Sequence, residues 1–191
     1  MDALYFLLLA LGIVVVAELG DKTQLMTISF ASRYSRRTIY IAAVLGMGII
    51  TVIGVAIGVA LYASLPIFYV KIVSAAIFIF FGVWVLLKKE ERLEEKEIPE
   101  KKVFIQTFIL FILAEFGDKT QLAVISLTAT SGHPWSVLVG ALIGFALVVA
   151  VGVLIGKEIG KRVKLEWIVL ASGIIFIIIG VILAVEAFLS G

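Results

Sequence analysis

A group of two acids and one lysine occurs twice in this chain, each time inside a long apolar stretch. The segment Ala17 to Leu25 (AELGDKTQL) recurs 97 positions later as Ala114 to Leu122 (AEFGDKTQL), and the copies differ only at Leu19 and Phe116. Placing an ionised side chain near the middle of a bilayer costs roughly 2.5–3.5 kcal/mol, and such charges usually mark ion pathways. The doubled motif therefore predicts a functional site inside a membrane.

The composition is that of a membrane protein. Of the 191 residues, 62% are hydrophobic, which is more than a soluble core can bury. Charged residues delimit six apolar stretches, most of them long enough to cross the roughly 30 Å hydrocarbon layer as a helix, and none alternates like a barrel strand. We therefore expect an all-α membrane protein with six transmembrane helices, at about 3–32, 38–63, 65–87, 103–131, 135–156 and 167–185.

Other classes of protein fit the sequence poorly. The chain has no cysteine, which excludes disulfides, thiolate metal sites and thiol redox chemistry. Its net charge of +2 says little by itself. We expect no nucleic acid partner, no resident cofactor and no enzymatic activity. The first stretch carries Asp2, lacks a basic region before it and leads into the motif, so we expect a retained helix rather than a cleaved signal peptide.

The basic residues are concentrated between alternate apolar stretches. Cytoplasmic loops of membrane proteins collect lysine and arginine. Apart from Lys22, Lys71 and Lys119, every basic residue falls in the first, third or fifth connection: Arg33, Arg36, Arg37, Lys88, Lys89, Arg92, Lys96, Lys101, Lys102, Lys157, Lys161, Arg162 and Lys164. This pattern predicts that these connections are cytoplasmic and that both termini lie outside a plasma or inner membrane.

The duplication extends beyond the motif. Gly54 to Gly58 (GVAIG) in the second stretch matches Gly152 to Gly156 (GVLIG) in the fifth at an offset of 98. We therefore expect two three-helix repeats, residues 1–87 and 103–191, that form one transport domain. Because three is odd, the second repeat must enter the membrane from the opposite side, which is the inverted-repeat plan of many secondary transporters.

The segment between the repeats is highly charged. Residues 88–102 hold six basic and six acidic side chains together with Pro99, which predicts a solvated cytoplasmic linker that is helical at its start and ends near the proline. Glycines four residues apart allow helices to pack closely. The pairs Gly54/Gly58, Gly140/Gly144 and Gly152/Gly156 favour packing inside the bundle, and they leave a homodimer open.

The motif offers hard oxygen ligands. On a continuous helix, Glu18, Asp21 and Gln24 share one face, and the second copy repeats this arrangement with Glu115, Asp118 and Gln121. Thr23 and Thr120 add hydroxyls, and Gly20 and Gly117 are candidate hinges where an open turn could add backbone carbonyls. Such a ligand set suits Ca²⁺, Mn²⁺ or Mg²⁺ rather than Cu⁺ or structural Zn²⁺.

Lys22 and Lys119 adjust the charge of this site. Four carboxylates and two lysines leave a net charge of −2, which one divalent cation or two protons would neutralise, so exchange of the two is expected. In the alternative interpretation, Glu18–Lys22 and Glu115–Lys119 are salt bridges that only hold helices together. That alternative leaves Asp21 and Asp118 without partners in hydrocarbon.

The doubled E-x-G-D-K-T-Q motif, six helices and a charged central linker resemble the membrane family of Golgi calcium/manganese–proton exchangers and bacterial manganese exporters. The resemblance covers the whole chain. It implies Ca²⁺/Mn²⁺ transport coupled to protons, with Glu18, Asp21, Glu115 and Asp118 as ligands, and in a chain this small it favours manganese export.

Two other functions are compatible with parts of the pattern. A passive divalent-cation channel could use the same acidic side chains, although channels usually place the pore on an oligomer axis. A membrane scaffold without transport would require that the charges only form salt bridges. A site on a two-fold axis within one chain favours alternating access, and therefore a divalent cation–proton antiporter.

Overall fold

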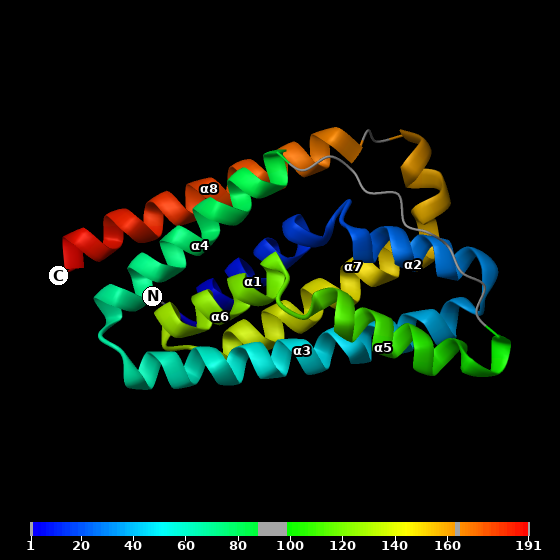
Figure 1. Cartoon of the computed structure of the whole chain (residues 1–191), viewed down its shortest axis with the longest axis horizontal. Helices are drawn as coiled ribbons and strands as arrows, with labels where there is room; N and C mark the ends of the chain where they lie inside the picture. The colour runs from blue at the N-terminus through cyan, green and yellow to red at the C-terminus, as the bar shows by residue number, and fades with distance from the viewer. Residues whose placement is uncertain (1, 88–98, 163–164, 191) are drawn as a thin grey trace.

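The computed structural model describes residues 2–87, 99–162 and 165–190, and these residues form a bundle of helices (Figure 1). A 3-10 turn at Glu100–Lys102 leads into the second half. The α-helices of the described residues are α1 Ala3–Glu18, α2 Lys22–Arg33, α3 Arg36–Ser64, α4 Ile67–Leu87, α5 Val103–Glu115, α6 Lys119–Ser131, α7 Pro134–Arg162 and α8 Leu165–Ser190.

The two stretches that carry the motif are broken helices. The first, predicted at 3–32, forms α1 and α2, which are bent by 69° to one another. The second, predicted at 103–131, forms α5 and α6. Gly20 and Gly117 have φ angles of 80° and 72°, in the left-handed region that only glycine adopts without strain. The expected hinges are therefore turns, each flanked by two half-helices.

Three helices are long and apolar enough to cross a membrane in the part of the chain that is described. They are α3, the Ile67–Trp84 part of α4 and the Pro134–Leu154 part of α7, and the bent pair α1 and α2 adds a fourth. The apolar segments Val103–Glu115 and Gly173–Leu189 are shorter. The structure thus confirms an all-helical chain with three to four candidate spans, which is fewer than the six predicted.

Equivalent helices of the two halves run in opposite directions (Figure 1). The chain passes through α1 and α2 from the end that holds both termini to the far end, and it returns through α5 and α6. In the same way α3 runs against α7, and α4 runs against α8. The contacts follow this arrangement, since α1 packs on α7, α5 packs on α3, and α4 packs along α8.

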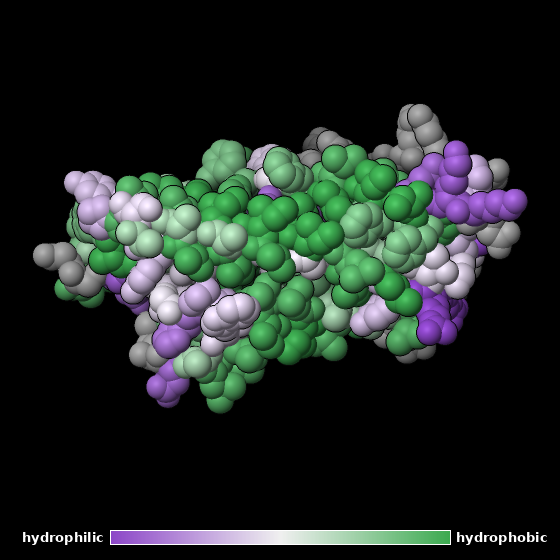
Figure 2. Space-filling view, turned by 90° about the horizontal axis from the view of Figure 1, so that it is seen from below, coloured by the Kyte–Doolittle hydropathy of each residue, from purple (hydrophilic) through white to green (hydrophobic). Residues whose placement is uncertain are grey.

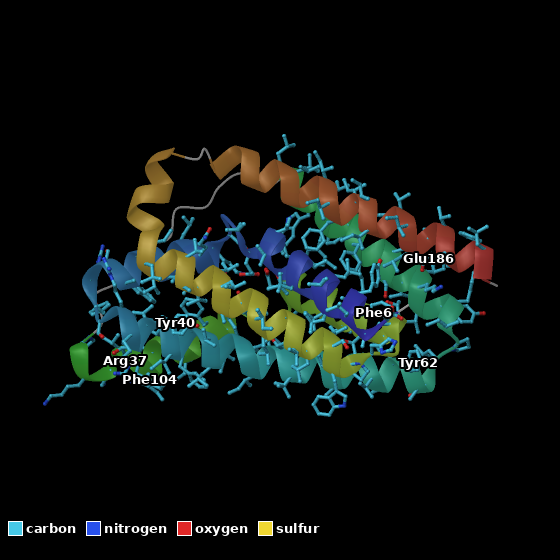
Figure 3. The ribbon with its side chains drawn as sticks, turned by 180° about the vertical axis from the view of Figure 1, so that it is seen from behind. Phe6, Arg37, Tyr40, Tyr62, Phe104 and Glu186 are labelled. Carbon is cyan, nitrogen blue, oxygen red and sulfur yellow. The ribbon has the colours of Figure 1, made fainter. Side chains whose placement is uncertain are left out.

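The surface has an apolar middle and polar ends, as Figure 2 shows. Arg33 ends α2, Arg36 and Arg37 begin α3, and Lys101 and Lys102 precede α5. Figure 3 places Arg37 and Phe104 at this basic end, and Phe6, Tyr62 and Glu186 at the other end. The side chains from Lys157 to Lys164 lie outside the described residues.

The paired glycines pack inside the bundle. A Cβ atom on Gly58 of α3 would lie 2.5 Å from the Cβ atom of Thr128 on α6, and one on Gly144 of α7 would lie 3.0 Å from Val14 on α1. Gly54, Gly140 and Gly152 also face neighbouring helices of the same chain. Internal packing is thus confirmed for these glycines, whereas the surroundings of Gly156 and most of the linker, residues 88–98, lie outside the described part.

Candidate cation site

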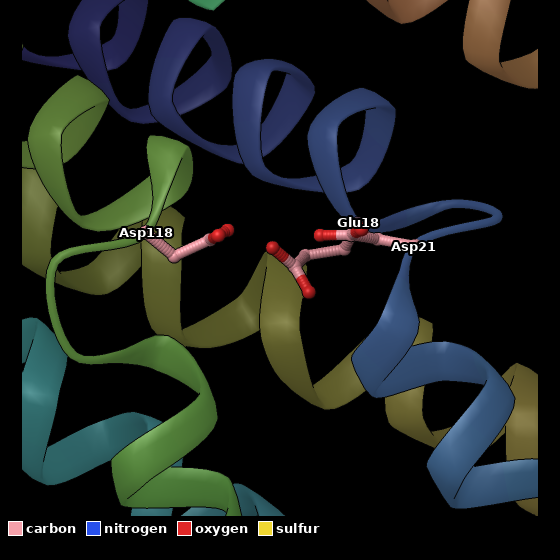
Figure 4. Close-up of side chains that lie close together, drawn as sticks. All are labelled: Glu18, Asp21 and Asp118. Atoms are coloured by element: carbon pink, nitrogen blue, oxygen red, sulfur yellow. The ribbon is translucent and has the colours of Figure 1, made fainter. Parts of the chain in front are cut away.

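The two breaks meet and bring three carboxylates together (Figure 4). Glu18 is the last residue of α1, Asp21 precedes α2 and Asp118 precedes α6. Each of the three offers an oxygen atom, and these atoms all lie within 4.8 Å of one another. Glu18 is fully buried and Asp118 is nearly so, whereas the Asp21 side chain is 24% exposed. Residues of both halves thus form one acidic cluster.

The route by which Glu18 and Asp21 approach each other differs from the one expected. The prediction that Glu18 and Asp21 share one helical face is wrong, because α1 ends at Glu18 and Asp21 has an extended backbone, with φ −82° and ψ 172°. The backbone N–H of Asp21 donates to the carbonyl of Glu18 over 3.1 Å, and Asp118 makes the same bond to Glu115. The glycine turn, rather than helical periodicity, places the two acids side by side.

A glutamine braces each turn. The backbone N–H of Gly20 donates to Oε1 of Gln24 over 2.5 Å, and the N–H of Gly117 donates to Oε1 of Gln121 over 2.6 Å. Both carboxamide oxygens, expected as supporting ligands, therefore already accept a hydrogen bond from the turn. Both copies of the motif make this bond, so it belongs to the local structure that the repeated sequence encodes.

The lysines pair across the two halves. Nζ of Lys22 lies 3.1 Å from Oδ1 of Asp118, and Nζ of Lys119 donates to Oδ2 of Asp21 and lies 3.5 Å from Oδ2 of Asp118. These contacts do not follow the Glu18–Lys22 and Glu115–Lys119 pairing that the scaffold interpretation required. The lysines are also unequal, because the Lys22 side chain is 38% exposed and that of Lys119 is 6% exposed.

Both threonines of the motif bind the same carboxylate. Oγ1 of Thr23 donates to Oε2 of Glu18 over 2.6 Å, and Oγ1 of Thr120 donates to Oε1 of Glu18 over 2.5 Å. The hydroxyls were expected as further ligands, and here they orient Glu18 instead. The two hydroxyls approach different oxygens of Glu18, so together they fix the orientation of its carboxyl group.

Glu115 stands apart from the other three acids. It is 1% exposed, and neither of its carboxylate oxygens accepts a hydrogen bond from any residue the structure describes. Its backbone carbonyl accepts the N–H of Asp118 over 3.1 Å, but its carboxylate does not join the group of Glu18, Asp21 and Asp118. The expected set of four converging carboxylates is thus a set of three with a fourth nearby.

The crossed ion pairs were not anticipated from the sequence, although a local pattern indicates the break that produces them. In Asp21-Lys22-Thr23-Gln24, an acid stands three residues before a glutamine at the start of an apolar run, which is typical of a helix N-terminus. Applied here, this rule ends the first helix before Asp21. It then predicts that Asp21 and Lys22 leave the face on which Glu18 lies.

A family model and several known proteins match this chain. A family model described as the divalent cation/proton antiporter GDT1 matches residues 6–93 and 103–191. A GDT1-like protein of Synechocystis is 30% identical, with 89% of this chain and 92% of the relative covered.

Two further relatives carry functional names. The Saccharomyces cerevisiae protein named Divalent cation/proton antiporter GDT1 is 25% identical, with 95% and 84% of the two chains covered. A Vibrio cholerae protein named Putative manganese exporter is 34% identical over 83% of this chain and 80% of its own length. No solved structure matches. The chain belongs to the GDT1 family of divalent cation/proton antiporters.

Proposed function

We propose that this protein exports a divalent cation, Mn²⁺ or Ca²⁺, in exchange for protons, and that manganese is its physiological substrate. The observation that carries the proposal is the cluster of Glu18, Asp21 and Asp118, whose oxygens lie within 4.8 Å of one another. Carboxylate oxygens without soft ligands suit hard divalent cations. Family membership supports the coupling to protons, and the name of the Vibrio cholerae relative supports manganese.

Each part of the motif has a role in this proposal. Glu18, Asp21 and Asp118 bind the cation directly, and Thr23 and Thr120 hold Glu18 in position. Glu115 completes the set as a fourth carboxylate when the surrounding helices rearrange. Gly20 and Gly117 form the turns, Gln24 and Gln121 brace them, and Lys22 and Lys119 set the net charge.

The same carboxylates carry the protons. A carboxylate must be deprotonated to bind a metal, so metal and protons compete for one set of oxygens. With Glu115 included, four carboxylates and two lysines have a net charge of −2, and either one divalent cation or two protons neutralises it. Turning the site from one side of the membrane to the other costs least in these two neutral states. Movement of the cation in one direction is therefore coupled to movement of protons in the other.

The proposed topology has six crossings in two inverted three-helix repeats. Residues 1–87 and 103–191 form the repeats, both termini lie outside the cell membrane, and the 88–102 linker is cytoplasmic. The opposite directions of equivalent helices support this plan, as does the gathering of Arg33, Arg36, Arg37, Lys101 and Lys102 at one end (Figure 1). If the two repeats exchanged conformations, the site would open first to one side of the membrane and then to the other.

Transport against a concentration gradient tests the proposal. Proteoliposomes with equal Mn²⁺ on both sides, and with the membrane potential clamped, receive a pH gradient. We expect net Mn²⁺ movement toward the acidic side, and release of protons when Mn²⁺ binds in a weakly buffered solution. Movement only down a Mn²⁺ gradient would overturn the antiporter and favour the passive channel.

Two variants serve as controls for this assay. Asp118→Asn should abolish the movement, because Asp118 belongs to the acidic cluster. Glu186→Gln should retain it, since Glu186 pairs with Lys71 between α4 and α8 and lies at one end of the bundle.

A further inference from the structure

A buried ammonium group already occupies the acidic cluster. Nζ of Lys119 contacts the carboxylates of Asp21 and Asp118, one from each half of the chain. The Lys119 side chain is only 6% exposed. These are two of the three carboxylates that approach closely enough to hold a metal ion together. A lysine of the motif and a divalent cation would therefore use the same two carboxylates.

We propose that Lys119 is a tethered competitor of the transported cation, whose ammonium must leave Asp21 and Asp118 before the ion can bind them. The proposal rests on the cation site proposed above and adds a role for a residue that is not a ligand. An ammonium is a compact point charge on a flexible stem, so it can substitute for a cation and then withdraw.

The competition has a cost and a benefit for transport. Because the ion must displace an existing ion pair, its net affinity is lower than that of the three carboxylates alone. The same displacement helps release, since the returning ammonium compensates Asp21 and Asp118 as the ion departs. An exporter needs this lower affinity and this help with release, because an ion that binds too tightly is not released.

Lys22 makes a weaker version of the same contact. It reaches Asp118 alone, over 3.1 Å, and its side chain is 38% exposed. Exposed ion pairs contribute much less than buried ones because water screens them. The two lysines of the repeated motif thus form a matched pair that differs in burial and in the number of carboxylates contacted.

Mn²⁺ binding to the purified full-length chain tests the proposal, with free Mn²⁺ followed by electron paramagnetic resonance. We expect Lys119→Gln to bind Mn²⁺ roughly 10- to 100-fold more tightly than wild type, the range set by a charged hydrogen bond. Lys22→Gln should gain less than about fivefold. Lys119→Arg should stay within about threefold of wild type or bind more weakly, because it keeps the charge.

Transport kinetics separate competition from structural damage. In proteoliposomes, Lys119→Gln should lower both KM and the maximal rate for Mn²⁺, whereas a damaged site raises KM. Lys71→Gln, which removes a lysine paired with Glu186 between α4 and α8, should change neither binding nor KM. An unchanged or weaker Mn²⁺ affinity in a folded Lys119→Gln protein overturns the proposal.

Two outcomes keep the test decisive. If Lys119→Gln does not fold, Lys119→Met carries the test, because methionine keeps much of the length of the lysine side chain without its charge, and an unchanged or weaker Mn²⁺ affinity in that variant overturns the proposal. If wild type itself binds no Mn²⁺, the proposed cation site fails, which is a different result from a wild-type site that binds Mn²⁺ without competition.

Discussion

The two copies of the motif have nearly the same sequence and the same turn, yet they use their side chains differently. In both copies a glycine with positive φ is braced by a glutamine four residues later. In the first copy Glu18 accepts two threonine hydroxyls, one from each copy, whereas in the second copy Glu115 accepts none from the described residues. Local sequence therefore determines the turn, and the surrounding helices determine how each acid is used.

The helices that follow the two turns, α2 and α6, also differ in how deeply they are buried. Along α6, nine side chains are buried, against four along α2. Helix α6 packs against α3, α4, α1 and α7, and α2 packs mainly against α7 and α3. This unequal cover explains why Lys119, at the start of α6, is buried while Lys22, at the start of α2, is partly exposed. Four sets of variants test whether this difference matters for function.

The largest effect is expected for Asp21→Asn and Asp118→Asn. Each replaces a charged ligand of the acidic cluster by a neutral amide, which removes one of the three close carboxylates that a hard divalent cation would bind. We expect Mn²⁺ affinity to fall by more than about 100-fold in both variants, as measured by titration of the purified protein. Wild-type affinity in either one would contradict the shared site, provided that thermal melting shows an intact fold.

The next test compares Glu18→Gln with Glu115→Gln. Because Glu18 belongs to the close group of carboxylates, its variant should lose roughly 10- to 100-fold in Mn²⁺ affinity. Glu115 lies outside that group, so Glu115→Gln should lose less than about tenfold in affinity but should still stop proton-driven transport. Equal losses of affinity would mean that the difference between the two copies has no functional meaning.

A smaller effect is expected for Thr23→Val and Thr120→Val. Each removes one hydrogen bond to Glu18 while keeping the side-chain shape, which corresponds to about 1.5 kcal/mol or roughly tenfold in Mn²⁺ affinity. In a Glu18→Gln background, Thr120→Val should add little further loss. A further tenfold loss of Mn²⁺ affinity in the double variant would show that Thr120 acts on a group other than Glu18. Strict symmetry between the copies would require that group to be Glu115.

The smallest effect concerns the turn that the copies share. A Cβ atom on Gly117 would have nothing within 4 Å, so Gly117→Ala isolates the cost of its φ of 72°, about 1–2 kcal/mol. Gly12→Ala is the matched control, because its Cβ atom is equally unobstructed within α1 and alanine favours the helix. Thermal melting in detergent should show a lower melting temperature for Gly117→Ala only.

Much of the architecture could be predicted from the sequence. Apolar length and charge spacing predicted the all-helical class, and the duplication predicted that the two motif segments would come together. The predicted shared helical face of Glu18 and Asp21 was wrong because a glycine turn overrides the helical period. The crossed lysines and the isolation of Glu115 could not be predicted, because they depend on packing between segments almost a hundred residues apart, and the repeated motif is nearly identical in both copies.

Counting bound ions tests most directly whether the two unequal copies build one site. Equilibrium dialysis of the purified chain against saturating Mn²⁺ should give one ion per chain for wild type. It should give none for Asp21→Asn and none for Asp118→Asn at the same Mn²⁺ concentration, because each copy supplies part of the same site. Two ions for wild type, with one retained in each variant, would mean that each copy binds its own ion and would contradict the account.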